Sequence, residues 1–342
     1  MLDDIKDHCE NTLKYIGAGT YCEAFKFYYD KTKCPHLNTD NRTECEQCKL
    51  YTQSDNYVIK EIRKTTRYSQ HDFDCEILNQ KHAMAYMPEL VVNIFESWNE
   101  VHDVDMHGNI IGNLGKKINV NKGSIIAAYG YITMEYMNYK DLYLNYKSGN
   151  PTVNWSLPIN MIGLVFICII ILYNLHSKLE ICHGDFRDTN IFLKYIGPDY
   201  KQHVKVDIDD ITHEYIVDTG GFHIKLGDFG LSETLYAGSK SFIFRDYEFL
   251  ENIYRNRDLW KWMMTDKSEY IRLISFLQTN FINNINQRMD YYHYLPEQAK
   301  SRVDFWYAKH SVSTHSIYLY EYPKELLVCF IKTFYSNQLQ TN

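Results

Sequence analysis

The sequence has no strong excess of charge of either sign. Its 36 lysines and arginines stand against 43 aspartates and glutamates, which leaves a net charge of −7. Proteins that bind nucleic acid or an anionic membrane surface through their overall charge carry an excess of basic residues. We therefore expect no nucleic-acid partner for this chain.

Long hydrophobic runs and a leader segment are also lacking. The apolar run MIGLVFICIIIL at Met161–Leu172 is shorter than a membrane-spanning helix, which needs about 20 apolar residues. Polar residues follow within its next turn, so we predict a buried core helix there and no membrane span. The N-terminal MLDDIKD does not resemble a signal peptide. We expect a cytoplasmic protein whose nine cysteines are mostly reduced thiols or metal ligands.

Internal repeats and low-complexity tracts are absent from the sequence. The chain is 45% hydrophobic and 15% aromatic, which is ample material for a packed core and excludes intrinsic disorder. Its 342 residues amount to about two domains, at roughly 150 residues per domain.

The hydrophobic pattern changes from strand-like in the first part of the chain to helical in the second. Short β-branched or aromatic runs between turn residues predict strands at Leu13–Ile16, Ala24–Tyr28, Tyr57–Lys60, Val92–Trp98 and Ile125–Met134. Apolar residues at helical spacing predict helices around Glu76 and over Met161–Leu172, Ile271–Ile282 and Lys324–Phe334. We place the boundary after residue 137, which gives a small strand-rich lobe over 1–137 and a larger helical lobe over 138–342. The predicted class is therefore α+β.

Three polar segments rich in turn residues interrupt this pattern, at residues 30–55, 101–124 and 195–222. Segments of this composition run over protein surfaces. We expect all three to project from the surface and to leave the core undisturbed.

The first candidate functional motif is a glycine pair, Gly17 and Gly19, between two predicted strands. Glycines permit a tight turn and let backbone N–H groups approach phosphate oxygens. Lys60 follows on a strand that reads as buried, where a cation is costly without a partner. Glu76, on the next predicted helix, is a suitable partner, and a nucleotide phosphate is another.

The second motif lies in the helical part of the chain. His183–Leu193 reads HGDFRDTNIFL, and Ile224–Gly230 reads IKLGDFG. An Asp, an Asn five residues later, a strand and then Asp-Phe-Gly form the working set of phosphoryl transfer. With the glycine pair, Lys60 and Glu76, the motifs occur in the order found in eukaryotic-type protein kinases. The chain resembles that superfamily from about Ile16 to at least residue 260, which implies a two-lobed kinase-like fold.

The resemblance assigns roles to the residues of the small lobe. Gly17 and Gly19 would cover the phosphates of ATP, and Lys60 would hold the α- and β-phosphates while pairing with Glu76.

The resemblance also assigns the catalytic loop. Asp185 would accept or orient the proton of the substrate hydroxyl, and Arg187 would supply the positive charge near the γ-phosphate. Asn190 and Asp228 would ligate Mg²⁺ as hard oxygen ligands. These residues imply a serine/threonine protein kinase with a protein substrate.

The resemblance also assigns the residues that would contact adenine. They lie in the segment Tyr131–Leu142, which reads YITMEYMNYKDL. Met134 resembles the gatekeeper, the backbone of Glu135–Met137 would meet the adenine edge, and Asp141 would lie near the ribose. Ala24 and Val58 would form part of the adenine ceiling. The nucleotide-binding set is then Ile16, Gly17, Ala18, Gly19, Ala24, Val58, Lys60, Met134, Glu135, Met137 and Asp141.

Several departures from the family pattern bear on regulation. Cys22 replaces a third glycine of the loop. Gly184 stands where regulated kinases have an Arg that docks an activation-loop phosphate. No Ala-Pro-Glu segment follows Asp-Phe-Gly, and Asp246, or alternatively Asp258, is the candidate to anchor the catalytic loop. We predict a short activation segment without a phosphorylation switch. These departures resemble those of divergent kinases, among them the kinases of large DNA viruses, with some haspin-like features. A viral origin would place the protein in the host cytoplasm or the virion.

A second constellation lies inside the first insertion. Cys34 and His36 are followed by the C-x₂-C pair Cys45 and Cys48, which is a usual zinc half-site. A polar insertion without its own core would gain stability from a metal. The sequence predicts a structural Zn²⁺ here, with reduced surface thiols as the alternative.

Two other functions stay open. Small-molecule kinases of the aminoglycoside or choline type often have His-Gly-Asp with an Asn five residues later, although Asp-Phe-Gly and the Met-Glu-Tyr-Met hinge favour a protein kinase. A nucleotide-binding pseudokinase scaffold is the second alternative. The complete set of Lys60, Glu76, Asp185, Asn190 and Asp228 argues against it.

Overall fold

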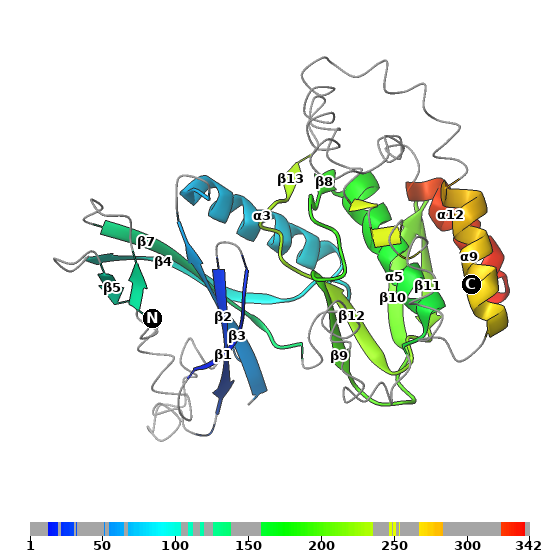
Figure 1. Ribbon diagram of the computed structural model, residues 1–342. Helices are drawn as coiled ribbons and strands as arrows, with labels where there is room; N and C mark the ends of the chain where they lie inside the picture. Colours follow the sequence, from blue (N-terminus) through cyan, green and yellow to red (C-terminus); the bar gives the residue numbers. More distant parts are fainter. Residues whose placement is uncertain are drawn as a thin grey trace, which may run out of the picture. The chain divides into compact units, whose positions relative to one another are not determined.

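We analysed a computed structural model of the chain, which is mixed α+β (Figure 1). The described residues are 13–19, 22–30, 32, 51, 55–64, 68–103, 109–111, 117–119, 126–137, 159–234, 246–247, 249–250, 253, 267–282 and 323–338. They fall into two compact units. Unit 1 consists of Met1–Ile77 and Asn93–Tyr136, and unit 2 consists of Leu78–Val92 and Met137–Asn342.

Unit 1 contains a five-stranded antiparallel sheet in the order β1-β2-β3-β7-β4. All five strands that the sequence predicts are present. Their bounds are Lys14–Ala18 for β1, Cys22–Tyr29 for β2, Asp55–Arg63 for β3, Ile94–Asp103 for β4 and Ile126–Glu135 for β7. A small hairpin of β5 (Asn109–Ile111) and β6 (Lys117–Asn119) lies within the second predicted insertion.

Helix α3 (Gln70–Tyr86) begins with a capping box. The Ser69 backbone N–H donates to the Asp72 carboxylate at 2.6 Å, and the Asp72 N–H donates to the Ser69 hydroxyl at 3.3 Å. The backbone hydrogen bond from Ser69 lowers the pKa of Asp72. In unit 1, the first part of the helix packs through Phe73, which is buried in a cluster with Ile62 and Ile132 of the sheet. The second part of α3 belongs to unit 2.

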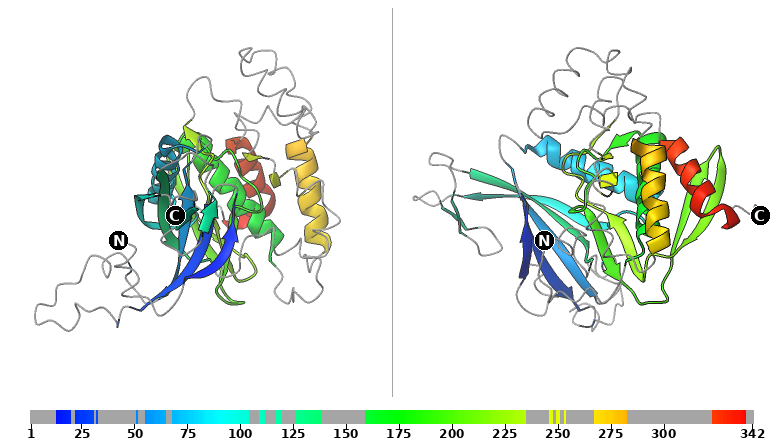
Figure 2. Two further views of the ribbon diagram at one scale, coloured as in Figure 1. Left: turned by 60° about the vertical axis from the view of Figure 1, so that its left-hand side comes forward. Right: turned by 45° about the vertical axis from the view of Figure 1, so that its right-hand side comes forward.

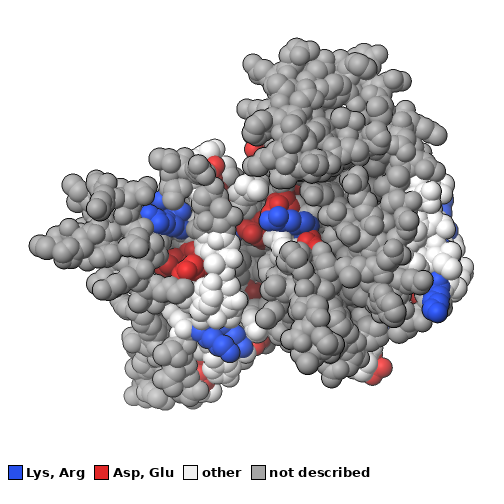
Figure 3. Space-filling model, in the orientation of Figure 1, with Lys and Arg blue, Asp and Glu red and all other residues white. Residues whose placement is uncertain are grey.

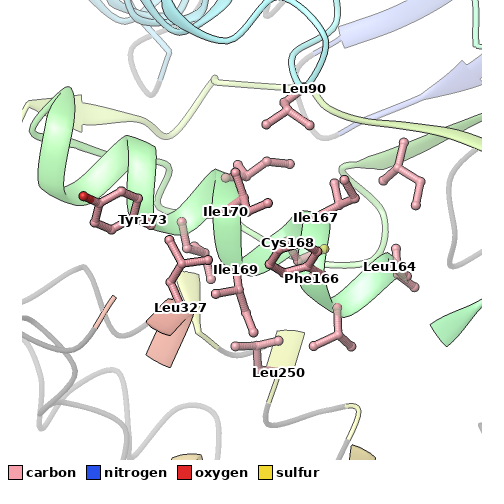
Figure 4. Close-up of a cluster of buried hydrophobic side chains, with 14 of the residues drawn as sticks. Leu90, Leu164, Phe166, Ile167, Cys168, Ile169, Ile170, Tyr173, Leu250 and Leu327 are labelled. Atoms are coloured by element: carbon pink, nitrogen blue, oxygen red, sulfur yellow. The ribbon is translucent and has the colours of Figure 1, made fainter. Parts of the chain in front are cut away.

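Unit 2 is built around helix α5 (Met161–Tyr173), as the apolar run predicts. Asn160 caps its N-terminus by accepting from the backbone N–H groups of Ile162 and Gly163. Every residue of the helix is buried, which is why the sequence is apolar on all sides and not on one stripe. Figure 4 shows Leu90 on one side of α5, with Leu250 and Leu327 on the other.

The segment Met161–Lys178, which is α5 with its π-helical continuation, is long and apolar enough to cross a membrane, but 89% of it is buried inside the protein. Burial on all sides is the environment of a core helix. This part of the sequence prediction is confirmed.

The third insertion does not simply project from the surface, so that prediction is wrong. It folds into an antiparallel hairpin of β10 (Gln202–Ile208) and β11 (Ile211–Val217). Alternate side chains of the hairpin enter the main core of unit 2, including Val204, Val206 and Tyr215. The reason is the period-2 pattern of both strands, which buries one face and leaves the other exposed.

The remaining helices pack on the same core. Helices α9 (Lys267–Leu277) and α12 (Pro323–Phe334) each bury one apolar face, and Figures 1 and 2 show both lying beside α5. The Phe166 ring of α5 stacks on Phe330 of α12 with ring centroids 5.4 Å apart. The ring of Phe276 from α9 meets Phe330 edge-on at 5.0 Å.

Candidate active site

A buried ion pair forms the candidate site of unit 1. Lys60 of β3 points from the sheet toward α3, and its Nζ lies 2.6 Å from Oε1 of Glu76. Both side chains are less than a tenth exposed. The Tyr68 hydroxyl donates to the second carboxylate oxygen of Glu76. The pairing of Lys60 with Glu76 that the sequence predicts is confirmed, and Tyr68 is an additional partner that the sequence did not indicate.

The register of the sheet places the predicted adenine-side residues on the face that carries Lys60. Ala24 is the cross-strand partner of Lys60, and Val58 is the partner of Met134. Because residues two apart on a strand share a face, these four side chains lie on one side of the sheet.

The glycine pair lies at the turn between β1 and β2, as the sequence predicts. Gly17 is in β1 between Ile16 and Ala18, and the Gly19 N–H donates to the carbonyl of Cys22 at 2.9 Å. A Cβ on Gly17 would meet nothing within 4 Å, so the strand is open around it. At the other end of the sheet, β7 ends at Glu135, and Met137 is buried in unit 2.

The candidate site of unit 2 is the loop His183–Asn190. Asn190 donates from its side-chain amide to the Asp185 carboxylate at 3.0 Å and to the Asp185 carbonyl at 2.9 Å. Arg187 lies 3.0 Å from the same carboxylate and is itself about half exposed. Burial is the largest influence on Asp185 and raises its pKa, while Arg187 opposes the shift. Asp185 is thus a partly desolvated carboxylate held by a cation and an amide.

The Asp246 carboxylate fixes the backbone of this loop. One oxygen accepts from the His183 N–H at 2.7 Å, and the other accepts from the Gly184 N–H at 2.8 Å. His176 donates from Nε2 to Asp246 at 2.9 Å, and the Tyr247 hydroxyl lies 3.4 Å from His176 Nδ1. Asp246, one of the two candidate anchors from the sequence, therefore holds the loop. The other candidate, Asp258, lies outside the described residues.

His183 is structural, as the sequence predicts. Its Nε2 donates to the Gly227 carbonyl at 3.1 Å, and its ring meets Phe229 edge-on with centroids 4.7 Å apart. Both side chains are completely buried. The histidine therefore ties the loop His183–Asn190 to the Asp-Phe-Gly segment.

A two-stranded pairing brings the two predicted metal ligands together. Strand β9 (Ile191–Tyr195) begins directly after Asn190, and β12 (Phe222–Leu226) ends just before Asp228. The strands are antiparallel, with Leu226 opposite Ile191, so Asn190 and Asp228 lie at the same end of the pair. The Gly227 N–H donates to the Asn190 carbonyl at 3.1 Å.

The chemistry of these donors fits Mg²⁺. One carboxylate and one amide oxygen are hard ligands, and a nucleotide-bound Mg²⁺ needs only one or two protein groups besides phosphates and water. Among the described residues, no group of three or more His, Cys, Asp or Glu side chains could form an all-protein metal site.

Acidic and basic side chains are mixed on the face in Figure 3. In the described part of that face, they form small neighbouring groups and no large area of one sign. This agrees with the near balance of charge in the sequence.

Some predicted site residues lie outside the described residues. They are the ribose candidate Asp141 and the zinc candidates Cys34, His36, Cys45 and Cys48.

One contact in this region has no counterpart in the sequence prediction. Asn79 of α3 donates to the hydroxyl of Ser232 at 3.0 Å, within unit 2. The two residues are 153 positions apart, and neither belongs to a motif. No signal in a single sequence could have paired them.

The chain matches no model of a known protein family, and no curated protein matches it.

Proposed function

We propose that the chain is a serine/threonine protein kinase of two-lobed kinase-like fold, which transfers the γ-phosphoryl group of ATP to a protein hydroxyl with Mg²⁺. The observation that carries the proposal is the arrangement of Asp185, Asn190 and Asp228 in unit 2. A candidate base and two hard oxygen ligands are held there by one loop and one strand pair. The buried pair of Lys60 and Glu76 in unit 1 supplies the cation that a nucleotide phosphate would need.

In this reaction, the substrate hydroxyl oxygen bonds to the γ-phosphorus and the bond to the β-bridging oxygen breaks, which releases ADP. Asp185 takes or orients the hydroxyl proton, and its raised pKa makes the carboxylate a better acceptor. Arg187 holds Asp185 in place and contributes positive charge beside it. Mg²⁺, bound with ATP at Asn190 and Asp228, would offset the phosphate charge.

The proposal includes a site that forms without phosphorylation of the activation segment. With Asp246 anchoring the loop, the segment between Asp228 and Asp246 is short, and Gly184 offers no side chain to receive a phosphate. We also propose a structural Zn²⁺ at Cys34, His36, Cys45 and Cys48, on the basis of their spacing alone. Metal analysis of the purified chain should find about one zinc per molecule, and serine at Cys45 and Cys48 should remove it.

The test is transfer of label from γ-labelled ATP with Mg²⁺, in parallel for the wild type, Asp185→Asn and Lys60→Met. Acceptors are casein, histone, the chain itself and a panel of small alcohols and aminoglycosides. Label on protein Ser or Thr that both variants lose is the expected result.

Two other results would contradict the proposal. Label on a small molecule alone would assign the chain to the small-molecule kinases, which the His-Gly-Asp motif allows. Nucleotide-induced thermal stabilisation without any transfer would identify a nucleotide-binding scaffold.

A further inference from the structure

The segment after Asp228 is held by a chain of hydrogen bonds within unit 2. The Asn79 side-chain amide donates to the Ser232 hydroxyl at 3.0 Å and to the Ser232 carbonyl at 3.3 Å. The Ser232 hydroxyl donates in turn to the Phe229 carbonyl at 2.7 Å, and the Ser232 N–H reaches the same carbonyl at 2.9 Å. Asn79, Ser232 and Phe229 are all buried, so water does not compete for these bonds.

The backbone next to this chain of bonds is strained. Asp228 has φ +61°, in the left-handed region that non-glycine residues rarely occupy. Such a conformation persists only where the surrounding structure determines it. The bonds of Asn79 and Ser232 fix the turn that begins one residue later, and therefore resist relaxation of Asp228.

A second set of contacts holds the other side of the same segment. The Leu231 carbonyl lies so close to Gly184 that a Cβ there would approach it to 2.3 Å. Strand β13 (Glu233–Thr234) pairs with β8 (Ile181–Cys182), which directly precedes the catalytic loop. These neutral contacts therefore hold the segment between the catalytic loop and α3.

We infer that Asn79 and Ser232 act as a positioning pair, which locks the Asp-Phe-Gly segment to α3 and keeps Asp228 in its left-handed conformation. The inference rests on the proposed kinase function for its catalytic consequence, because Asp228 is the proposed Mg²⁺ ligand. In this chain, the pair holds the segment after Asp228 in place, a role that an activation-loop phosphate would otherwise have. Asn79 lies three residues after Glu76 in α3. It acts through Asp228 and does not touch the substrate.

The experiment compares Asn79→Ala, Ser232→Ala and the double variant in the full-length chain. Removing a buried hydrogen bond of this kind should lower kcat about tenfold and leave KM for ATP nearly unchanged. Amide hydrogen exchange over Phe229–Ser232 should accelerate by a similar factor. The loss in the double variant should be smaller than the product of the two single losses, because both single variants remove the bond between Asn79 and the Ser232 hydroxyl.

Gln80→Ala is the matched control. Gln80 is the next residue of α3, is fully buried and donates to the Val92 carbonyl at 2.9 Å, away from Ser232. It should lower the melting temperature comparably without a selective change in exchange at Phe229–Ser232. If one alanine variant fails to fold, the other measures the same pair.

Two results separate the possible failures. If both single variants have the kcat of the wild type and the same amide exchange at Phe229–Ser232, the inference of a positioning pair is wrong and the kinase proposal stands. If the wild type transfers no phosphate, the kinase proposal fails. The exchange measurement still decides whether the pair holds the segment.

Discussion

Asp185 is a carboxylate that the fold partly desolvates. Burial raises its pKa above the ordinary value, more than Arg187 and Asn190 lower it. A carboxyl whose pKa is raised on folding binds its proton more tightly in the folded chain. Its contribution to stability is therefore full at low pH and is lost as the pH rises through the folded pKa.

We predict that Asp185→Asn is more stable than the wild type near pH 7, although it is inactive. The amide is neutral at every pH, whereas the wild-type carboxyl is charged and desolvated at pH 7. The advantage should shrink as the pH is lowered to about 3, where the wild-type carboxyl is also protonated. Urea unfolding midpoints over this pH range measure the difference. A stability difference that does not depend on pH would contradict the prediction.

Gly184 occupies a position that admits no side chain. It has φ +74°, and an added Cβ would meet the Leu231 carbonyl oxygen at 2.3 Å. A larger side chain could not enter here without moving the backbone of the segment.

We predict that Gly184→Ala destabilises the chain by about 1–3 kcal/mol, because a left-handed conformation and a backbone contact both oppose the methyl group. Gly197→Ala is the comparison, since that glycine also has positive φ but has nothing within 4 Å of an added Cβ. It should cost less. Equal losses in thermal unfolding would show that the contact with Leu231 contributes nothing.

At the scale of elements, the β10–β11 hairpin is part of the core. Val206 is 2% exposed, whereas its neighbour Lys205 lies on the outer face and pairs with Glu214. The two positions therefore test the two faces of one strand.

Val206→Ala should destabilise the chain by about 1–3 kcal/mol through lost burial and the cavity left behind. Lys205→Ala should leave the unfolding midpoint unchanged, because an exposed ion pair is screened by water and salt. The comparison is made by denaturant unfolding of both variants. If Val206→Ala were as harmless as Lys205→Ala, the hairpin would not belong to the core.

The same hairpin shows where sequence analysis succeeds and fails. Alternation over Gln202–Ile208 and Ile211–Val217 is present in the sequence, but the polar, turn-rich composition of residues 195–222 favours a surface insertion. Asp209 and Asp210 lie at the turn with positive φ. Val204 and Val206, on one face of β10, enter the core. Composition alone could not distinguish the two faces.

The five strands of the main sheet of unit 1 and helix α5 could be predicted, because their local patterns agree with their final environment. The buried pair of Lys60 and Glu76 could be predicted as well, because a cation on a buried strand requires a partner. The contact of Asn79 with Ser232 could not, because it depends on tertiary packing between distant segments.

At the scale of the whole molecule, the contacts around Asp228 favour a site that is complete as folded. We predict that chain produced without any phosphorylation has the same specific activity as chain treated with an activating kinase. Phosphatase treatment should also leave activity unchanged. A large gain on phosphorylation of the segment after Asp228 would contradict the prediction.

Helix α5 has a consequence for how the chain is made on the ribosome. One of its partners, α12, begins at Pro323, and its Phe330 and the following Tyr335 cover Phe166. At a synthesis rate of about 5–20 residues per second, α5 emerges roughly 8–30 s before α12. Throughout that interval, the face of α5 that α12 covers is exposed, and apolar surface of this kind is what chaperones bind. Release of the chain from such a chaperone should therefore depend on completion of α12, whose packing ends the exposure of this apolar face to aggregation.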